Sequence, residues 1–68
     1  MQILVNGKSM EINTPLTLAE LLQRYDISTS TGRVAVALND YIAPREGWNT
    51  RLVKDGDRIE IIHAVQGG

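Results

Sequence analysis

The sequence predicts a small α+β domain in which a single helix packs on one face of a mixed four- to five-stranded sheet. Three observations indicate this fold class. Two strand patterns joined by an Asn6-Gly7 turn open the chain, one amphipathic helix pattern follows, and further strand patterns fill the second half. Because a helix with one apolar face must bury that face, the sheet is the layer that covers it.

The first two strand patterns form a predicted β-hairpin. Residues 1–5 are apolar at almost every position, as expected of a strand. The Asn6-Gly7 dipeptide readily supplies the two positive φ angles of a type I′ turn. Residues 9–13 alternate between two faces and are followed by Thr14-Pro15. Proline ends the strand because it has no N–H for the ladder and restricts the residue before it.

The helix has unusually complete start signals. Thr17 is the predicted N-cap and Glu20 stands three residues later, which makes a capping box, while Leu16 and Leu21 are spaced as a hydrophobic staple. Helical periodicity then places four large side chains on one stripe that we expect to face the core. These are Leu18, Leu21, Leu22 and Tyr25.

The second half of the chain reads as a loop and three further strands. Residues 28–32 have the composition of a loop. Residues 33–38 form a strand with large side chains on one face and the small Ala35 and Ala37 on the other. A turn leads to a short segment at 41–43, and the last strand covers residues 58–64.

Two other stretches have more than one interpretation. Trp48 could be an interface anchor, but in a chain with three aromatic residues we expect it to pack over the edge of the core. The Asp55-Gly56-Asp57 stretch lacks the further oxygen ligands of a calcium loop, so we interpret it as a turn.

Together these elements predict a β-grasp arrangement, in which the last strand lies beside the first and the helix crosses over the sheet. We expect a β-grasp domain over residues 1–64 and a flexible Gly-Gly tail over residues 65–68, called the tail below. The predicted core consists of Ile3, Val5, Ile12, Leu18, Leu21, Leu22, Val34, Val36, Leu38, Ile59 and Ile61.

Composition excludes several classes of function. The 68-residue chain has no cysteine and a formal charge of −1, so a thiol nucleophile is excluded and nucleic acid is not an expected partner. No apolar run approaches the ~18 residues of a spanning helix, and we expect a cytoplasmic protein without a membrane partner. The lone His63 has no paired acid at motif spacing, which favours a structural role. We therefore predict no catalytic and no metal-binding residue.

The end of the chain is the main functional candidate. A patterned strand continues through Val65 and Gln66 into Gly67 and Gly68. Glycines leave the backbone unhindered, which suits insertion into a narrow partner groove. A frayed terminus would be the alternative interpretation. On the outer face of the sheet, Ile62, Ala35 and Ala37 would form an exposed apolar patch leading to the tail. Such patches commonly mark docking surfaces.

Several of these motifs occur in the same order and spacing in a known family, which the chain resembles over nearly its whole length. The chain is similar to the ThiS family of sulfur carriers of thiamin biosynthesis, within the ubiquitin-like superfamily. The motifs that carry the resemblance are residues 1–7, the Leu-Leu helix, residues 42–48, residues 55–59 and the closing Gly67-Gly68.

This resemblance implies a carrier and not an enzyme. The Gly68 carboxylate would be adenylated by an E1-like, ThiF-like enzyme using ATP, with Gly67, Gln66 and Val65 inserted in its groove. A persulfide donor protein would then convert it to a thiocarboxylate, which would supply sulfur to a ThiG-like thiazole synthase. The carrier itself would bind no cofactor. Two alternatives stay open at this point: the small subunit of molybdopterin synthase, and a ubiquitin-like modifier or interaction module.

Overall fold

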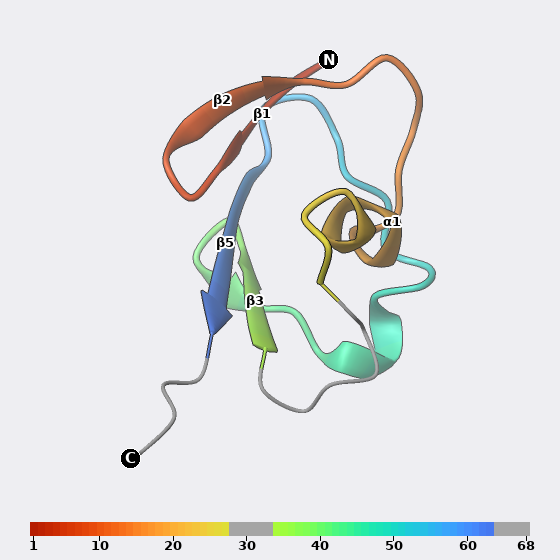
Figure 1. The fold of residues 1–68 in the computed structure, drawn as a ribbon, viewed down its shortest axis with the longest axis vertical. Coiled ribbons are helices and arrows are strands. Elements are labelled where there is room, and N and C mark those ends of the chain that lie inside the picture. Colours follow the sequence, from red (N-terminus) through yellow and green to blue (C-terminus); the bar gives the residue numbers. More distant parts are fainter. Residues whose placement is uncertain (28–33, 64–68) are drawn as a thin grey trace.

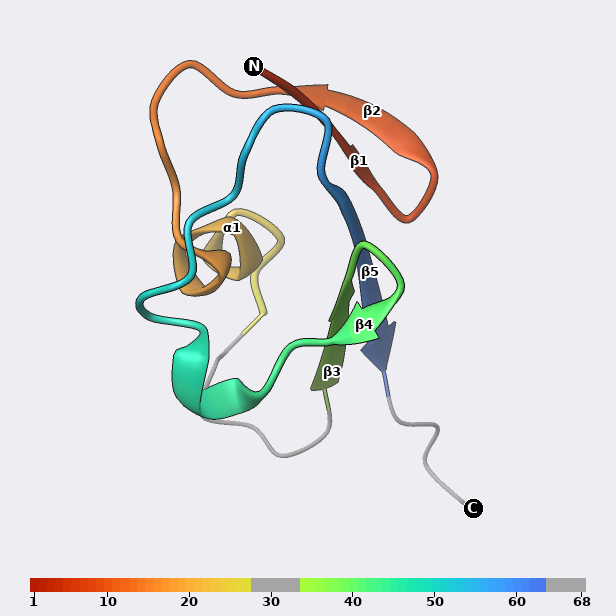
Figure 2. The same ribbon diagram turned by 180° about the vertical axis from the view of Figure 1, so that it is seen from behind.

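A computed structural model of the protein describes residues 1–27 and 34–63. Its five strands form one sheet in the order β2-β1-β5-β3-β4, and the helix α1 packs on one side of it (Figures 1 and 2). The central pair, β1 and β5, is parallel, whereas the other neighbours are antiparallel. This confirms the predicted mixed sheet and fold class. The elements are β1 Gln2–Val5, β2 Lys8–Glu11, α1 Leu18–Gln23, β3 Val34–Leu38, β4 Tyr41–Ile42, a 3₁₀ turn at Arg45–Gly47 and β5 Arg58–His63.

The first hairpin forms as predicted. Asn6 and Gly7 have φ angles of 51° and 83°, as a type I′ turn requires. The resulting register pairs Ile3 with Met10 and Val5 with Lys8. The turn therefore fixes which side chains of β1 face the helix, because a shift by one residue would exchange the two faces.

The start of α1 is secured from two directions. The Glu20 N–H donates to Thr17 Oγ1 at 3.1 Å and the Thr17 N–H donates to Glu20 Oε1 at 2.9 Å, which confirms the capping box. Two further N–H groups of the first turn would lack a partner inside the helix. Those of Leu18 and Ala19 donate instead to the carbonyls of Arg51 and Trp48. The helix start is thus held against the segment that precedes β5.

The prediction that Tyr25 belongs to the core is wrong. The helix ends at Gln23, and Asp26 then adopts a left-handed conformation with a φ of 59°. The N–H groups of Asp26 and Ile27 donate back to the carbonyls of Gln23 and Leu22, which is the bond pair of a Schellman ending.

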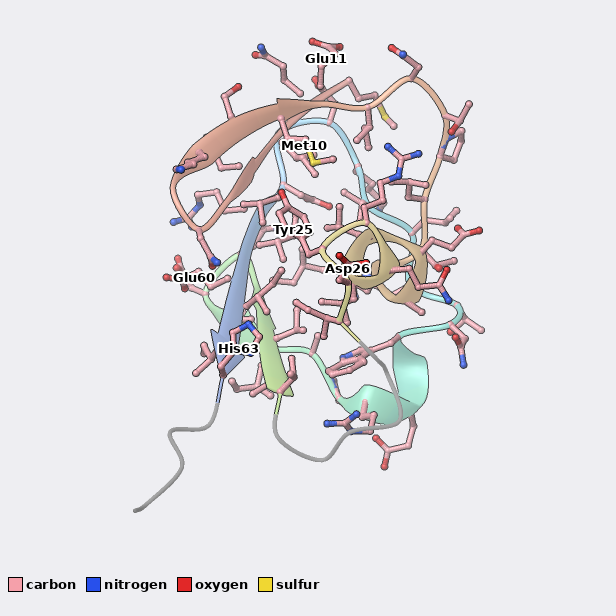
Figure 3. All side chains as sticks on the ribbon, viewed as in Figure 1. Met10, Glu11, Tyr25, Asp26, Glu60 and His63 are labelled. Carbon is pink, nitrogen blue, oxygen red and sulfur yellow. The ribbon has the colours of Figure 1, made fainter. Side chains whose placement is uncertain are left out.

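This ending exchanges the roles of two side chains. Ile27 turns back to pack on the core, while Tyr25 stays 44% exposed. Its hydroxyl lies 3.5 Å from Met10 Sδ, beside β2 (Figure 3).

The core lies between the sheet and α1, and every residue of the predicted core is buried. The predicted staple partner Leu16 joins this cluster, and so do Ala19 and Val53. Trp48 is only 2% exposed, and its indole N–H donates to the Ala43 carbonyl at 2.9 Å. The expectation that Trp48 packs with the core is therefore confirmed.

The acidic stretch before β5 is a turn, as predicted. Gly56 has a φ of 84°, and both neighbouring carboxylates accept backbone hydrogen bonds. Asp55 Oδ1 accepts from the Gln2 N–H, and Asp57 Oδ2 accepts from the Lys54 N–H, each at 2.7 Å. Asp57 thus closes the turn on itself, and Asp55 ties the turn to the start of β1.

Candidate functional site

The candidate site begins where β5 ends. This strand is the central one of the sheet. It ends at His63, at the end of the sheet that lies away from the β1–β2 hairpin (Figures 1 and 3). The predicted reacting residue Gly68 and the predicted insertion residues Gly67, Gln66 and Val65 lie outside the described residues. Ile62 and His63, both exposed, are the last described residues before the tail.

Three strands contribute to the outer face of the sheet near this end. The register places Ala35 opposite Ile62 and Ala37 opposite Glu60. On the other side of β3, Ala37 lies opposite Ile42 of β4. Opposite residues of paired strands project to the same face, and this is the face away from α1. We call Ile62, Ala35 and Ile42, with Ala37 between them, the root patch.

The sequence prediction for this face needs one correction. Ile62 is 48% exposed and Ala35 is also exposed, as predicted, but Ala37 is only 7% exposed. Its methyl group lies between the longer side chains of Ile42 and Glu60, which its two neighbouring strands place opposite it. Ala37 is therefore a floor of the root patch and offers little surface to a partner.

The structure adds Ile42, which sequence reasoning did not place in this patch. Its side chain is 66% exposed, although it belongs to a strand paired in the sheet. The available signal was a β-branched apolar residue in a short segment next to the turn at Asn39-Asp40. That signal could not give the partner strand, because β4 is only two residues long.

Charged groups bound the root patch on the side away from the tail. Arg58 and Asp40 form an ion pair at 2.6 Å. The hydrogen bond that Arg58 donates to Asp40 raises the pKa of Arg58 above its ordinary value, and the charges of Asp40 and Glu60 act in the same direction. Both partners of the pair are exposed, so it contributes little stability. Its position still gives the outer face an apolar end near the tail and a charged end farther away.

A cleft of about 570 Å³ opens on the other side of β4. Residues of β4 and of the segment that follows it supply most of the lining, with α1 and the end of β3 supplying the rest: Tyr41, Ile42, Ala43, Pro44, Gly47, Trp48, Thr50 and Arg51, and Leu18, Leu38 and Asn39. Among the described residues that line the cleft, Arg51 is the one with a charged side chain.

Within the described ranges 1–27 and 34–63, no three His, Cys, Asp or Glu side chains are grouped so as to hold a metal ion. In the same residues, no helix is long and apolar enough to cross a membrane.

Comparison with known proteins gives consistent results. A model of the ThiS family matches residues 3–68. The sulfur carrier protein ThiS of Escherichia coli K12 is 38% identical over 68 residues, which cover all of both chains. A crystal structure of the thiamine biosynthesis protein ThiS of Geobacter metallireducens superposes with a TM-score of 0.82 at 33% identity, again over the whole of both chains.

A longer protein also matches. The thiazole synthase of Paramagnetospirillum magneticum is 29% identical over 68 residues, which are all of this chain and 20% of that protein. The superposition over the whole of both chains agrees with the fold described above. The chain belongs to the ThiS family.

Proposed function

We propose that this protein is a sulfur carrier of thiamin biosynthesis, and that its Gly68 carboxylate carries the sulfur as a thiocarboxylate. The observation that carries this proposal is the family match over residues 3–68, which includes both glycines of the tail. Gly67 and Gly68 have no side chains, so the terminus is slim enough for an enclosed active site.

The chemistry proceeds in two stages. In the first, a carboxylate oxygen of Gly68 attacks the α-phosphate of ATP on an E1-like activating enzyme, and pyrophosphate leaves. In the second, the terminal sulfur of a protein persulfide attacks the acyl carbon, and AMP leaves. A thiol then cleaves the resulting acyl disulfide by forming a new disulfide with the donor sulfur, which releases the thiocarboxylate. The main contribution of the carrier to these reactions is to position its terminal carboxylate for attack.

The domain contributes the docking surface for these partners. The root patch presents exposed Ile62 and Ile42 beside the point where β5 ends. A partner that covers this patch would bury apolar surface and would also have the tail within reach. Each residue of an extended chain adds at most ~3.6 Å of reach.

The acceptor of the sulfur is proposed to be a thiazole synthase. Support comes from the thiazole synthase of Paramagnetospirillum magneticum, one fifth of which matches the whole of this chain. A carrier-like segment and a synthase in one polypeptide fit a direct transfer between the two. The same matches favour the thiamin route over a molybdopterin synthase subunit or a protein modifier. We place the reaction in the cytoplasm, with ATP bound by the activating enzyme and not by the carrier.

The test is stepwise activation with purified partners. The carrier, its cognate activating enzyme and ATP should release pyrophosphate. After a persulfide donor is added, the intact mass of the carrier should rise by the difference between one sulfur and one oxygen. That gain should disappear when thiazole synthase and its substrates are supplied. A carrier that releases no pyrophosphate or never gains sulfur would overturn the proposal.

A further inference from the structure

The end of β5 loses its main-chain neighbour on the β1 side. The parallel register pairs Val5 with Ile59, and β1 then turns away at Asn6-Gly7. The Asn6 N–H donates to the Ile59 carbonyl at 2.9 Å. The next N–H on this side, that of Ile61, has no strand left to bond to and donates to Asn6 Oδ1 at 2.8 Å. A side chain thus replaces the missing strand.

The same replacement occurs on the far side of β3. The Ala43 N–H donates to the Val36 carbonyl at 2.8 Å. One residue later the chain reaches Pro44, which has no N–H to donate. The next carbonyl on this edge of β3, that of Val34, accepts from the Arg45 guanidinium, with Nη2 at 2.9 Å. Arg45 therefore continues the β3 ladder beyond the end of β4.

The Arg45 guanidinium is itself held in place. Its central carbon lies 4.6 Å from the centroid of the Trp48 ring, within the range of a cation–π interaction. Trp48 is buried and bonded to the Ala43 carbonyl. The fixed indole thus orients the guanidinium toward Val34, so Arg45 connects the core to the first residue of β3.

These two side chains bracket the last paired residues before the tail. The Val36 carbonyl and the Ile61 N–H point away from the boundary between β3 and β5. Because backbone groups alternate in direction along a strand, the N–H and carbonyl groups of Ala35 and Ile62 point toward each other. Val34 and Ile61 are at 7% and 8% exposure, among the least covered members of the core. Apolar burial is therefore thinnest at the end of the sheet where the two side chains act.

We propose that Arg45 is a positioning residue for the terminal carboxylate. By holding Val34, and with Asn6 holding Ile61 from the other side, it fixes the end of β5 and so the point and direction in which the chain leaves the domain. This role rests on the proposed carrier function. In this role Arg45 acts through the β3 backbone, to which it donates a hydrogen bond at Val34.

Arginine suits this position better than lysine. Its planar guanidinium can stack on an aromatic ring while its N–H groups donate in the plane, whereas an ammonium group is a compact, strongly hydrated charge. Arg45→Met keeps an apolar stem and removes the hydrogen bond to Val34 and the cation–π interaction with Trp48. Arg45→Lys keeps the charge and can restore part of the hydrogen bonding. The matched control is Arg51→Met, because Arg51 is exposed and its side chain has no hydrogen bond or ion pair to the described residues.

The first readout is amide hydrogen exchange, followed residue by residue by NMR. Arg45→Met should speed exchange at Ala35 and Ile62 by roughly tenfold, the order expected for the loss of one charge-assisted hydrogen bond. Leu21 and Leu22 in α1 should change far less, and Arg51→Met should leave all four rates unchanged. Asn6→Gly, which keeps a turn-compatible backbone and removes Oδ1, should speed exchange at Ile61. Exchange at Ala35 and Ile62 that stays at the parent rate, or rises equally at Leu21 and Leu22, would overturn the anchoring role.

The second readout is the rate of thiocarboxylate formation at varied carrier concentration. Because the root patch is intact in Arg45→Met, KM should stay near the parent value while kcat falls by roughly threefold or more, since a misplaced carboxylate reaches its attack geometry less often. Arg45→Lys should recover part of kcat. A parent that acquires no sulfur would overturn the proposed function itself. A parent that acquires sulfur while Arg45→Met keeps its kcat would overturn only the positioning role.

Discussion

The two faces of the sheet place similar side chains in different surroundings. Ile61 and Ile62 are neighbours in β5, yet the first is 8% exposed and the second 48% exposed. Val36 and Ala35 of β3 differ in the same sense, with Val36 buried against α1 and Ala35 exposed. A small domain buries only about 60% of its unfolded surface, so it needs its inner face for stability. The apolar residues of the outer face stay exposed to solvent, and it is there that we propose the docking surface.

This difference separates folding from function in one small domain. Substitutions on the inner face should act on the free energy of unfolding and only indirectly on activation. Substitutions at the root patch or in the tail should act on activation while the domain stays folded. Each prediction below tests that separation.

The largest expected effect is at the end of the chain. Deleting Gly68 draws the carboxylate back by ~3.4 Å, and appending a residue places the reactive carbonyl inside a peptide bond. Either change should abolish pyrophosphate release by the activating enzyme while the thermal unfolding midpoint stays unchanged. Gly67→Val should impair the reaction by adding bulk and restricting φ, and Ala64→Ser is the matched control with little expected effect. Normal activation of the deleted or extended forms would contradict the carrier mechanism.

The next largest effect is on stability. Leu22 is fully buried on α1, and Leu22→Ala should lower the free energy of unfolding by ~2 to 5 kcal/mol, a large part of a small domain's stability. Leu4→Ala removes the same atoms from a half-exposed site on the outer face and should cost under ~1 kcal/mol. Urea denaturation of both variants measures this. Equal losses would show that the two faces do not differ as described.

A third prediction concerns the root patch. Ile62→Asp should weaken binding to the activating enzyme by at least roughly tenfold, which corresponds to about 1.4 kcal/mol, with little change in stability because the side chain is already half in water. Leu4→Asp places the same charge on the same face beside Arg58, away from the patch, and should bind as the parent does. Calorimetric titration distinguishes them. An Ile62→Asp variant that binds normally, or that fails to fold, would refute the assignment of this face.

The smallest expected effect is at the helix end. Tyr25→Ala should change stability by less than ~1 kcal/mol, because it removes a half-exposed ring and a weak contact with Met10. Ile27→Ala should cost more, since Ile27 packs on the core. The two midpoints in a thermal scan give the comparison. A larger loss for Tyr25→Ala would mean that the aromatic ring, and not Ile27, covers this end of the core.

Short-range chemistry explains why much of the fold could be predicted. The Asn6-Gly7 turn and the Thr17–Glu20 capping box depend on residues within four positions of each other, and both formed as expected. The core followed from periodicity, because the strand and helix periods assign each side chain to one face. The tail was a recognisable candidate because Gly67-Gly68 is a sequence feature in itself.

Long-range placement explains what could not be predicted. Tyr25 is the local exception: it was misassigned because the helix ends through a left-handed Asp26, a conformation usually taken by glycine. Ala37 was misassigned because its cover comes from Ile42 and Glu60 in two other strands. The roles of Asn6 and Arg45 depend on partners 55 and 11 residues away in the chain, which no local pattern reveals.

The central claim is that Gly68 carries sulfur, and the most direct measurement is the intact mass of the protein isolated from the cells that make it, with thiazole synthase removed so that the loaded carrier accumulates. We expect a species heavier than the unmodified chain by the difference between one sulfur and one oxygen, and fragmentation should place the change at Gly68. The unmodified mass alone, or conjugates joined through Gly68 to lysine side chains of other proteins, would contradict the account.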